Sequence, residues 1–244
     1  AVEYDQAGTQ TILSSHTYYD LEIDGSGSKR TDGNTSTNGD VTITAGTLDI
    51  DNGNDNLTIG GNFSNSGTLS ASNQTITFSG STQNTSSIIN DNTVDLIVDK
   101  SSTGGITFQG NSVFDEVTIS DGYLDIGAYT FQATNIITIA SDGTLKIPNG
   151  GTFDADGQLT TSGTIDFTGT GSQGDLVCSS TSANTFGTLD DAVGTVTFDG
   201  SSSQAIPAET FFNLKNSNSS GLTMSGDATV NGELNLNVAA DITT

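Results

Sequence analysis

The side chains that most often carry catalysis are scarce in this chain. His16 is the only histidine and Cys178 is the only cysteine. Cys178 ends the apolar run 176–178. We predict a small buried hydrophobic residue there, because a lone cysteine forms neither an internal disulfide nor a paired zinc ligand set. His16 follows two serines before an expected strand. We interpret it as a surface or turn residue, since nothing in the sequence places a nucleophile and a carboxylate around it.

Carboxylates are plentiful, and two of them could hydrolyse a glycosidic bond. Asp125 and Asp166 hold matching outward positions of two related segments, so they are the candidates for such a pair. Elimination beside a uronate would also need a base and neutralising cations. The basic residues are few and scattered along the sequence: Lys29, Arg30, Lys100, Lys146 and Lys215. We therefore predict that the chain is not an enzyme and assign no catalytic residue. A polysaccharide-acting β-helix enzyme is kept as an alternative.

Two acidic turns carry the hard oxygen ligands that Ca²⁺ prefers. Asp49, Asp51 and Asp55 surround Gly53, and residues 154–157 read Asp-Ala-Asp-Gly. Neither stretch matches a helix-loop-helix calcium loop or a glycine-rich nonapeptide repeat. We assign no metal ligand, no cofactor and no cofactor-binding residue, and keep Ca²⁺ as an alternative. Diffuse screening of the acidic surface by divalent ions is the interpretation we favour.

Thr-x-Thr pairs could order water if they formed a flat ladder on one face. They lie at Thr42/Thr44, Thr75/Thr77 and Thr195/Thr197. Threonine has a high β propensity and commonly takes outward strand positions. Because the pairs do not recur in every expected coil, we favour this ordinary role over an ice-binding face.

Composition favours a β protein with a thin core. Only 32% of the 244 residues are hydrophobic, whereas 30 are glycine, and helix formers are poorly represented. Five lysines and arginines against 29 acidic residues give a formal net charge of −24. Such a field repels phosphates, so we exclude nucleic acids and anionic membranes as partners. No apolar run reaches about 18 residues, and we expect no membrane insertion.

A glycine-led strand motif recurs along the chain. It is clearest at 122–126, 143–147 and 163–167, and in each copy apolar and polar residues alternate as in a strand buried on one face. A fixed period of this size without helical periodicity predicts an all-β, parallel, right-handed β-helix with coils of about 20 to 24 residues. We expect Leu124, Leu145 and Ile165 to point inward together. The intervening Asp125, Lys146 and Asp166 should point to water.

A longer pattern divides the expected single solenoid, residues 1–244, into three modules. Val-x-aromatic-Asp followed by Gln-x-Ile occurs at 2–12 and again at 196–206, with a shorter relative from Ile76 to Gln83. The modules are therefore predicted at about 2–75, 76–195 and 196–244. The last ends mid-pattern after Leu236, so we expect a segment of a longer repeat protein.

Together these motifs resemble the β-strand repeats of very large secreted bacterial surface adhesins. They are broadly similar to the β-helices of filamentous haemagglutinin and autotransporter passengers. The matching features are a Val-Thr-Phe strand, a later Gln-x-Ile, an aromatic Asn/Asp-Leu strand, and Thr-Val-Asn-Gly-x-Leu-x-Leu at 229–236. The resemblance covers nearly the whole chain and implies an adhesive or filament-forming role. It carries over no functional residue, because the shared positions are core and turn positions.

We therefore expect a non-catalytic structural and adhesive segment of an extracellular surface protein or fibre, located outside the cell or on a bacterial surface. Its ligand would be a cell-surface or extracellular glycan or protein. Polar flanks and longer turns, such as 29–39 and 173–184, would hold that ligand. The alternative is a filament subunit that associates with itself end to end.

Overall fold

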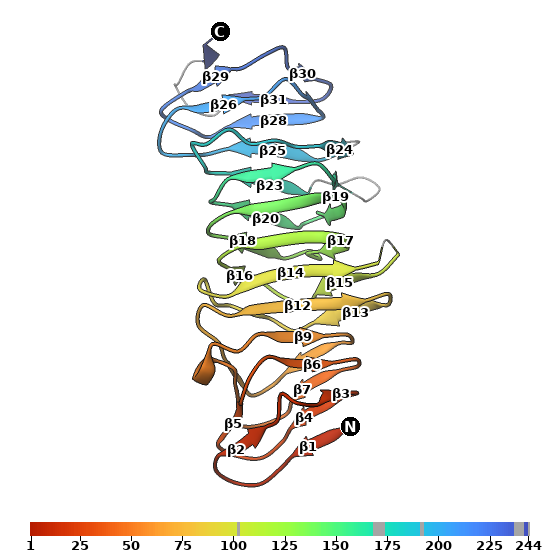
Figure 1. The fold of residues 1–244 in the computed structure, drawn as a ribbon. Helices are drawn as coiled ribbons and strands as arrows, with labels where there is room; N and C mark the ends of the chain where they lie inside the picture. Colours follow the sequence, from red (N-terminus) through yellow and green to blue (C-terminus); the bar gives the residue numbers. More distant parts are fainter. Residues whose placement is uncertain (102, 168–173, 191–192, 237–241, 244) are drawn as a thin grey trace.

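The chain winds into a stack of parallel β coils, a solenoid of about 11 turns. The computed structural model describes residues 1–101, 103–167, 174–190, 193–236 and 242–243. Every strand pairing in these ranges is parallel, and their one helix is a short 3-10 turn, η1 (Asp51–Gly53). The two termini lie at opposite ends of an elongated rod (Figure 1). The predicted all-β parallel solenoid is therefore confirmed.

Each coil passes over three faces, which we number in chain order. Face 1 carries β1 (Val2–Tyr4), β4 (Leu21–Ile23), β7 (Val41–Ile43), β10 (Phe63–Asn65), β13 (Gln83–Ser86), β15 (Gly105–Phe108), β22 (Thr164–Asp166), β24 (Thr188–Asp190), β27 (Thr210–Phe211) and β30 (Thr229–Val230). Face 2 carries β2 (Gln10–Ile12), β5 (Ser28–Thr31), β8 (Thr47–Asp49), β11 (Thr68–Ser70), β16 (Ser112–Phe114), β18 (Thr130–Ala133), β20 (Thr152–Ala155), β23 (Asp175–Cys178), β25 (Thr195–Phe198), β28 (Asn213–Asn216) and β31 (Leu234–Leu236).

Face 3 completes the coil. It carries β3 (Thr17–Tyr18), β6 (Thr35–Thr37), β9 (Leu57–Ile59), β12 (Thr75–Gly80), β14 (Asp95–Lys100), β21 (Leu159–Thr161), β26 (Gln204–Ile206), β29 (Leu222–Met224) and β32 (Ile242–Thr243). Two long strands, β17 (Val117–Asp125) and β19 (Ile137–Lys146), run from face 3 onto face 1 without a break. They join most of these two faces into one large sheet, whereas face 2 and the last strands of faces 1 and 3 form separate sheets.

The strand register confirms the predicted inward ladder. Leu124 pairs with Leu145 and Leu145 with Ile165, and all three side chains are fully buried. The alternate positions of the same strands are partly exposed, as expected. Successive register partners are 18 residues apart at Ile106 and Leu124 and 24 apart at Ile165 and Leu189. The coils therefore vary more in length than the predicted 20 to 24 residues, because the corner loops differ in size.

The interior changes character along the rod. Near the N-terminus it is filled mainly by aliphatic side chains such as Ile23, Ile43 and Leu57. In the middle, phenylalanines stack on one another from coil to coil. The ring centroids of Phe131 and Phe153 are 5.6 Å apart and the rings are within 11° of parallel. Such aromatic pairs add about 0.5–1.5 kcal/mol each to the burial of their area.

Corner loops turn some backbone carbonyls toward the interior, where they need hydrogen-bond donors. Lys29 meets this need between faces 1 and 2. Its side chain is fully buried, and its Nζ donates to the carbonyl oxygens of Gln6 (3.0 Å), Gly8 (3.2 Å), Gly25 (3.2 Å) and Ser26 (3.0 Å). One ammonium group thus holds two successive corner loops together.

Lys100 has the same role between faces 3 and 1. Its Nζ donates to the Ser79 carbonyl (2.6 Å), to Asn84 Oδ1 (2.7 Å) and, at 3.5 Å, to the Gly60 carbonyl. Burial lowers the pKa of the Lys100 amine to about 8, because the charged form loses its hydration. We call Lys29 and Lys100 the corner lysines.

The corner between faces 2 and 3 uses amides instead. Gln204 is almost fully buried, and its Nε2 donates to the carbonyls of Cys178 (2.7 Å) and Ser180 (2.9 Å). Its Oε1 accepts from the Gly200 N–H (2.8 Å) and from Asn218 Nδ2 (2.9 Å). All three kinds of corner are therefore stabilised from inside by a long polar side chain.

The repeated sequence motif marks a strand, a corner and a strand rather than a fixed face. Its copies at 2–12, 76–83 and 196–206 begin on face 1, face 3 and face 2, respectively. The division into three modules remains a prediction.

Candidate functional site

The two single reactive residues lie in the predicted environments. Cys178 faces the core and is 1% exposed, and burial raises the pKa of its thiol. His16 is exposed on a turn, where its Nδ1 lies 3.0 Å from Ser15 Oγ. Asp32, on the next coil, accepts the Ser14 N–H, and this hydrogen bond with the nearby His16 lowers the pKa of its carboxyl group. No described hydrogen bond joins a carboxylate to the imidazole, so these contacts do not form a nucleophilic triad.

Asp125 and Asp166 share a face but do not lie side by side. They belong to one outward column of face 1, and Lys146 stands between them in the register. Two strand spacings of ~4.8 Å separate the backbones of the two aspartates. The Lys146 ammonium lies 3.7 Å from the ring centroid of Tyr123. Burial, and then the neighbouring Asp190, raise the pKa of the Asp166 carboxyl, while Lys146 lowers it.

The first proposed calcium turn distributes its carboxylates among different partners. Asp49 Oδ2 lies 3.1 Å from Arg30 Nε. Asp55 is nearly buried and accepts a 2.7 Å hydrogen bond from the Thr31 hydroxyl. Asp51 is exposed at the start of η1. The three acids therefore stabilise the coil separately instead of converging on one point.

The second acidic turn belongs to a larger acidic cluster on face 2, formed by Asp154, Asp156, Asp175 and Asp199. Burial first, and then repulsion by the other three carboxylates, raise the pKa of Asp154 to about 6. Asp156 accepts a 2.7 Å hydrogen bond from Gln132 Nε2. In the part of the chain that the structure describes, no group of three or more His, Cys, Asp or Glu side chains could hold a metal ion.

The Thr-x-Thr pairs do not form a common ladder. Thr42 lies on face 1, Thr77 on face 3 and Thr197 on face 2. Sequence reasoning missed a different arrangement, a column of single hydroxyl residues along face 3 that we call the hydroxyl column. It consists of Thr17, Ser36, Thr58, Thr77, Thr118, Thr138 and Thr160, with Ile97 between Thr77 and Thr118.

The hydroxyl column is free to bind outward. Among the described contacts, none of its seven side-chain hydroxyls has a partner within the chain. Elsewhere, hydroxyls such as those of Thr31 and Thr197 are engaged by carboxylates of adjacent coils. The column repeats at the strand spacing of ~4.8 Å along the rod. A regular, uncharged line of hydrogen-bonding groups is thus available for contact with a ligand.

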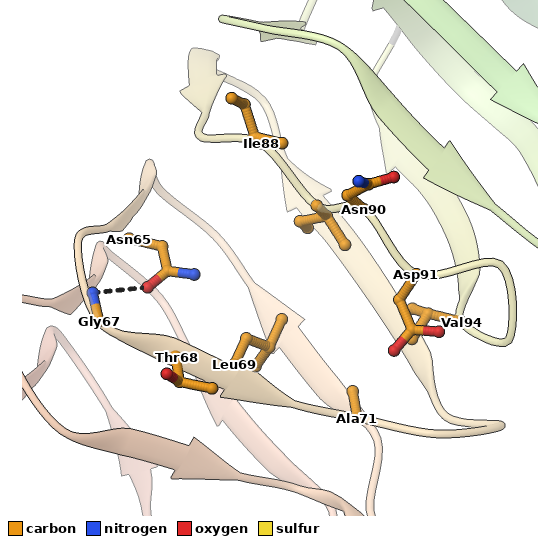
Figure 2. Close-up of a pocket in the computed structure, with 10 residues that line it drawn as sticks. Asn65, Gly67, Thr68, Leu69, Ala71, Ile88, Asn90, Asp91 and Val94 are labelled. Atoms are coloured by element: carbon orange, nitrogen blue, oxygen red, sulfur yellow. Dashed lines mark hydrogen bonds between the residues drawn. The ribbon is translucent and has the colours of Figure 1, made fainter.

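A crevice of about 230 Å³ interrupts face 2 (Figure 2). It lies between β11 and residues 88–91 of the next coil, and its walls include Asn65, Leu69, Ala71, Ile88, Asp91 and Val94. β11 is an edge strand. Asn90, on the opposite wall, makes an isolated bridge to Val113 of β16, on the side away from the crevice. The sequence gives no signal for this crevice, because it arises from the relative placement of two coils.

Hydrogen bonds close the crevice at both ends. At one end the Asn65 N–H donates to Ser87 Oγ (3.0 Å). At the other end the Asn73 N–H donates to the Thr93 carbonyl (2.9 Å). The coils are therefore joined on either side of a short stretch where their backbones do not pair.

The segments expected to hold a ligand need correction. Residues 29–39 are not a longer turn, because β5 and β6 occupy most of them and the Lys29 side chain is internal. In the segment 173–184, residue 173 lies outside the described residues and Asp175–Cys178 form β23, whereas residues 179–184 do form a turn without strand structure. The outward columns and the crevice are the better candidates for contact.

Comparisons with protein-family models, with curated proteins and with solved structures give no match to this chain. In the residues that the structure describes, no helix is long and apolar enough to cross a membrane.

Proposed function

We propose that this chain is a non-catalytic structural and adhesive segment of an extracellular surface protein or fibre, with a glycan or protein as its ligand. The observation that carries this proposal is the continuous stack of parallel coils around one narrow core, closed at its corners by internal polar side chains. In such a stack each coil contacts only its neighbours, so a rod can be lengthened without changing its design.

The use of charged groups supports a structural role. The corner lysines are buried and bound to acceptors of the chain, mostly backbone carbonyls, and Arg30 pairs with Asp49. The lysines thus support the corners from inside and the arginine pairs on the surface, and these groups do not meet at a shared centre. The hydroxyl column supplies the complementary feature, an ordered outer line of hydroxyl groups on face 3 from Thr17 to Thr160.

A glycan microarray probed with the purified chain tests the adhesive role. We expect binding to a restricted group of glycans, weakened at least about tenfold by T118K/T138K, because two lysines would cover the centre of the hydroxyl column. The control T144K/T164K makes the same charge change on face 1 and should bind as the parent does. Cleavage of a polysaccharide that is abolished by D166N would overturn the non-catalytic assignment.

End-to-end assembly is a second candidate. The coils at the two edges of the described stack carry exposed apolar side chains: Val2 in β1 (44% exposed), Leu13 just after β2 (45%) and Leu234 in β31 (50%). Exposed strand edges with apolar residues favour pairing with further coils. Sedimentation velocity over a hundredfold concentration range tests this candidate: growing species that L13K/L234K prevents would support a filament subunit, and a constant monomer would exclude it.

A further inference from the structure

We propose that the crevice on face 2 is a docking site for an extended peptide segment of another protein. Here two edges of the solenoid wall face each other without pairing. β11 pairs only with β8, and Asn90 bridges only to Val113. Below the crevice β11 pairs with β8 along its full length, and complete strand pairing on face 2 resumes above it between β16 and β18.

The lower wall presents one residue, Leu69, whose backbone N–H and C=O groups are unpaired. The Thr68 N–H donates to the Gly46 carbonyl (2.9 Å), and the Ile50 N–H donates to the Ser70 carbonyl (3.0 Å). Successive residues of a parallel strand direct their N–H and C=O groups to opposite neighbours. The backbone groups of Leu69 therefore point away from β8 and toward the crevice.

The upper wall presents a second residue, Asn90, whose backbone N–H and C=O groups are unpaired. The Val113 N–H donates to the Ile89 carbonyl (3.0 Å), and the Asp91 N–H donates to the Val113 carbonyl (3.1 Å). By the same alternation, the backbone groups of Asn90 point down into the crevice. Figure 2 shows Leu69 and Asn90 on opposite walls of this space.

An extended polypeptide has the chemistry that these walls require. Its N–H and C=O groups alternate between its two sides, so one inserted strand can pair with both edges at once. Both walls present unpaired backbone groups, on the strand β11 and at the bridge residue Asn90, which makes a peptide a better occupant than a ligand without a repeating amide. The closed ends at Asn65 and Asn73 limit the inserted part to a few residues.

The lining side chains narrow the choice of peptide. Leu69, Ile88 and Val94 offer apolar contact, and Asp91 is the single charged residue of the described lining. With a formal net charge of −24 on the chain, a neutral or basic segment is favoured over an acidic one. The described lining has no aromatic ring on which a sugar could stack.

Two blocked peptides copied from the chain itself provide matched probes. Acetyl-Gly-Thr-Leu-Lys-Ile-amide repeats residues 143–147, and acetyl-Gly-Thr-Leu-Asp-Ile-amide repeats residues 46–50. Amide NMR of the full chain should show saturable shifts centred on Leu69 and Asn90, with slower hydrogen exchange at both. We expect the lysine peptide to bind about threefold more tightly than the aspartate peptide. N-methylation of the lysine peptide at Thr and Lys should abolish the shifts.

A proline substitution tests the crevice from the protein side. N90P removes a donor that has no described partner, and should weaken the lysine peptide at least about tenfold. The control N92P falls at the second position of the turn closed by the Val94 N–H and the Asp91 carbonyl, where proline is tolerated, and should bind normally. If N90P fails to fold, the N-methylated peptide decides. Three results would each overturn the proposal: slow exchange of the Leu69 and Asn90 amides in the free protein, equal binding of the N-methylated peptide, or shifts produced by oligosaccharides alone.

Discussion

The two regions on either side of the crevice have the same kind of coil but fill its interior with different side chains. The N-terminal region, residues 1–59, buries aliphatic side chains together with the polar residues Lys29, Thr31, Thr35, Thr37 and Asp55. The aromatic region, residues 105–155, buries the rings of Phe108, Phe114, Phe131 and Phe153, and Ser112 is its one fully buried polar residue.

The difference shows that the coil backbone does not determine which type of side chain occupies an inward position. An inward position can hold an apolar side chain that packs on its neighbours above and below, or a polar one that supplies donors to the corner loops. The first solution gains from area and stacking. The second removes the cost of unpaired carbonyls, which is about 1–3 kcal/mol for each buried group.

The largest effect should come from breaking the aromatic region. Phe131 contacts Phe108, Phe114 and Phe153 at centroid distances of 5.1, 5.3 and 5.6 Å. We expect F131A to cost about 4 kcal/mol of unfolding free energy, because it leaves a cavity and removes three ring contacts. L48A should cost about 3 kcal/mol in the N-terminal region. Denaturant unfolding combined with site-resolved hydrogen exchange measures both.

The control for F131A is Y129A. Because Tyr129 is 40% exposed, this substitution should lower the unfolding free energy by well under 1 kcal/mol. If F131A cost no more than L48A, the stacked rings would add nothing to ordinary burial and the comparison of the two regions would fail.

The next effect should come from the N-terminal region. K29M keeps an apolar stem of similar length but leaves four carbonyl oxygens without their donor. We expect a loss of about 3 kcal/mol, with faster hydrogen exchange confined to residues 6–31. The adjacent R30M is the matched control, since the Arg30 side chain is 47% exposed and its ion pair contributes about 0–1 kcal/mol. Equal losses for K29M and R30M would show that the corner does not depend on the buried ammonium.

The sequence predicts the repeating part of the fold better than its exceptions. Leu124, Leu145 and Ile165 were predictable because glycine spacing and strand alternation are local signals. The burial of the corner lysines was not, since lysine is normally exposed and most of the acceptors are backbone carbonyls of another coil. The hydroxyl column escaped prediction because coil lengths vary, so its members share no fixed spacing. The crevice depends on two coils that fail to pair, and no residue type marks that event.

The second corner lysine should make stability depend on pH. Burial lowers the pKa of Lys100 from 10.5 to about 8, so the folded protein binds this proton less tightly than the unfolded chain. Stability should therefore rise with pH from about 8 toward 10.5, by at most about 3 kcal/mol. K100M should remove this rise, whereas the control K215M should retain it because Lys215 is partly exposed. A parent protein whose unfolding free energy is flat between pH 8 and 10 would contradict the assignment.

The smallest effect concerns the acidic cluster on face 2, which begins at Asp154, at the C-terminal end of the aromatic region. The pKa of Asp154 is raised to about 6, so the folded protein holds this proton more tightly than the unfolded chain does. The resulting stabilisation is present at low pH and is lost as the pH rises from about 4 through 6. At pH 7 the ionised Asp154 carboxylate destabilises the folded protein. D154N should therefore stabilise the protein by about 1 kcal/mol after allowance for solvent screening. The benefit should vanish below pH 4, and D142N, at an exposed position of face 3, should change stability little at either pH. If D154N stabilised the protein equally at pH 3.5 and pH 7, its effect would come from packing. Repulsion among the carboxylates of the acidic cluster would then not distinguish this part of the rod from the N-terminal region.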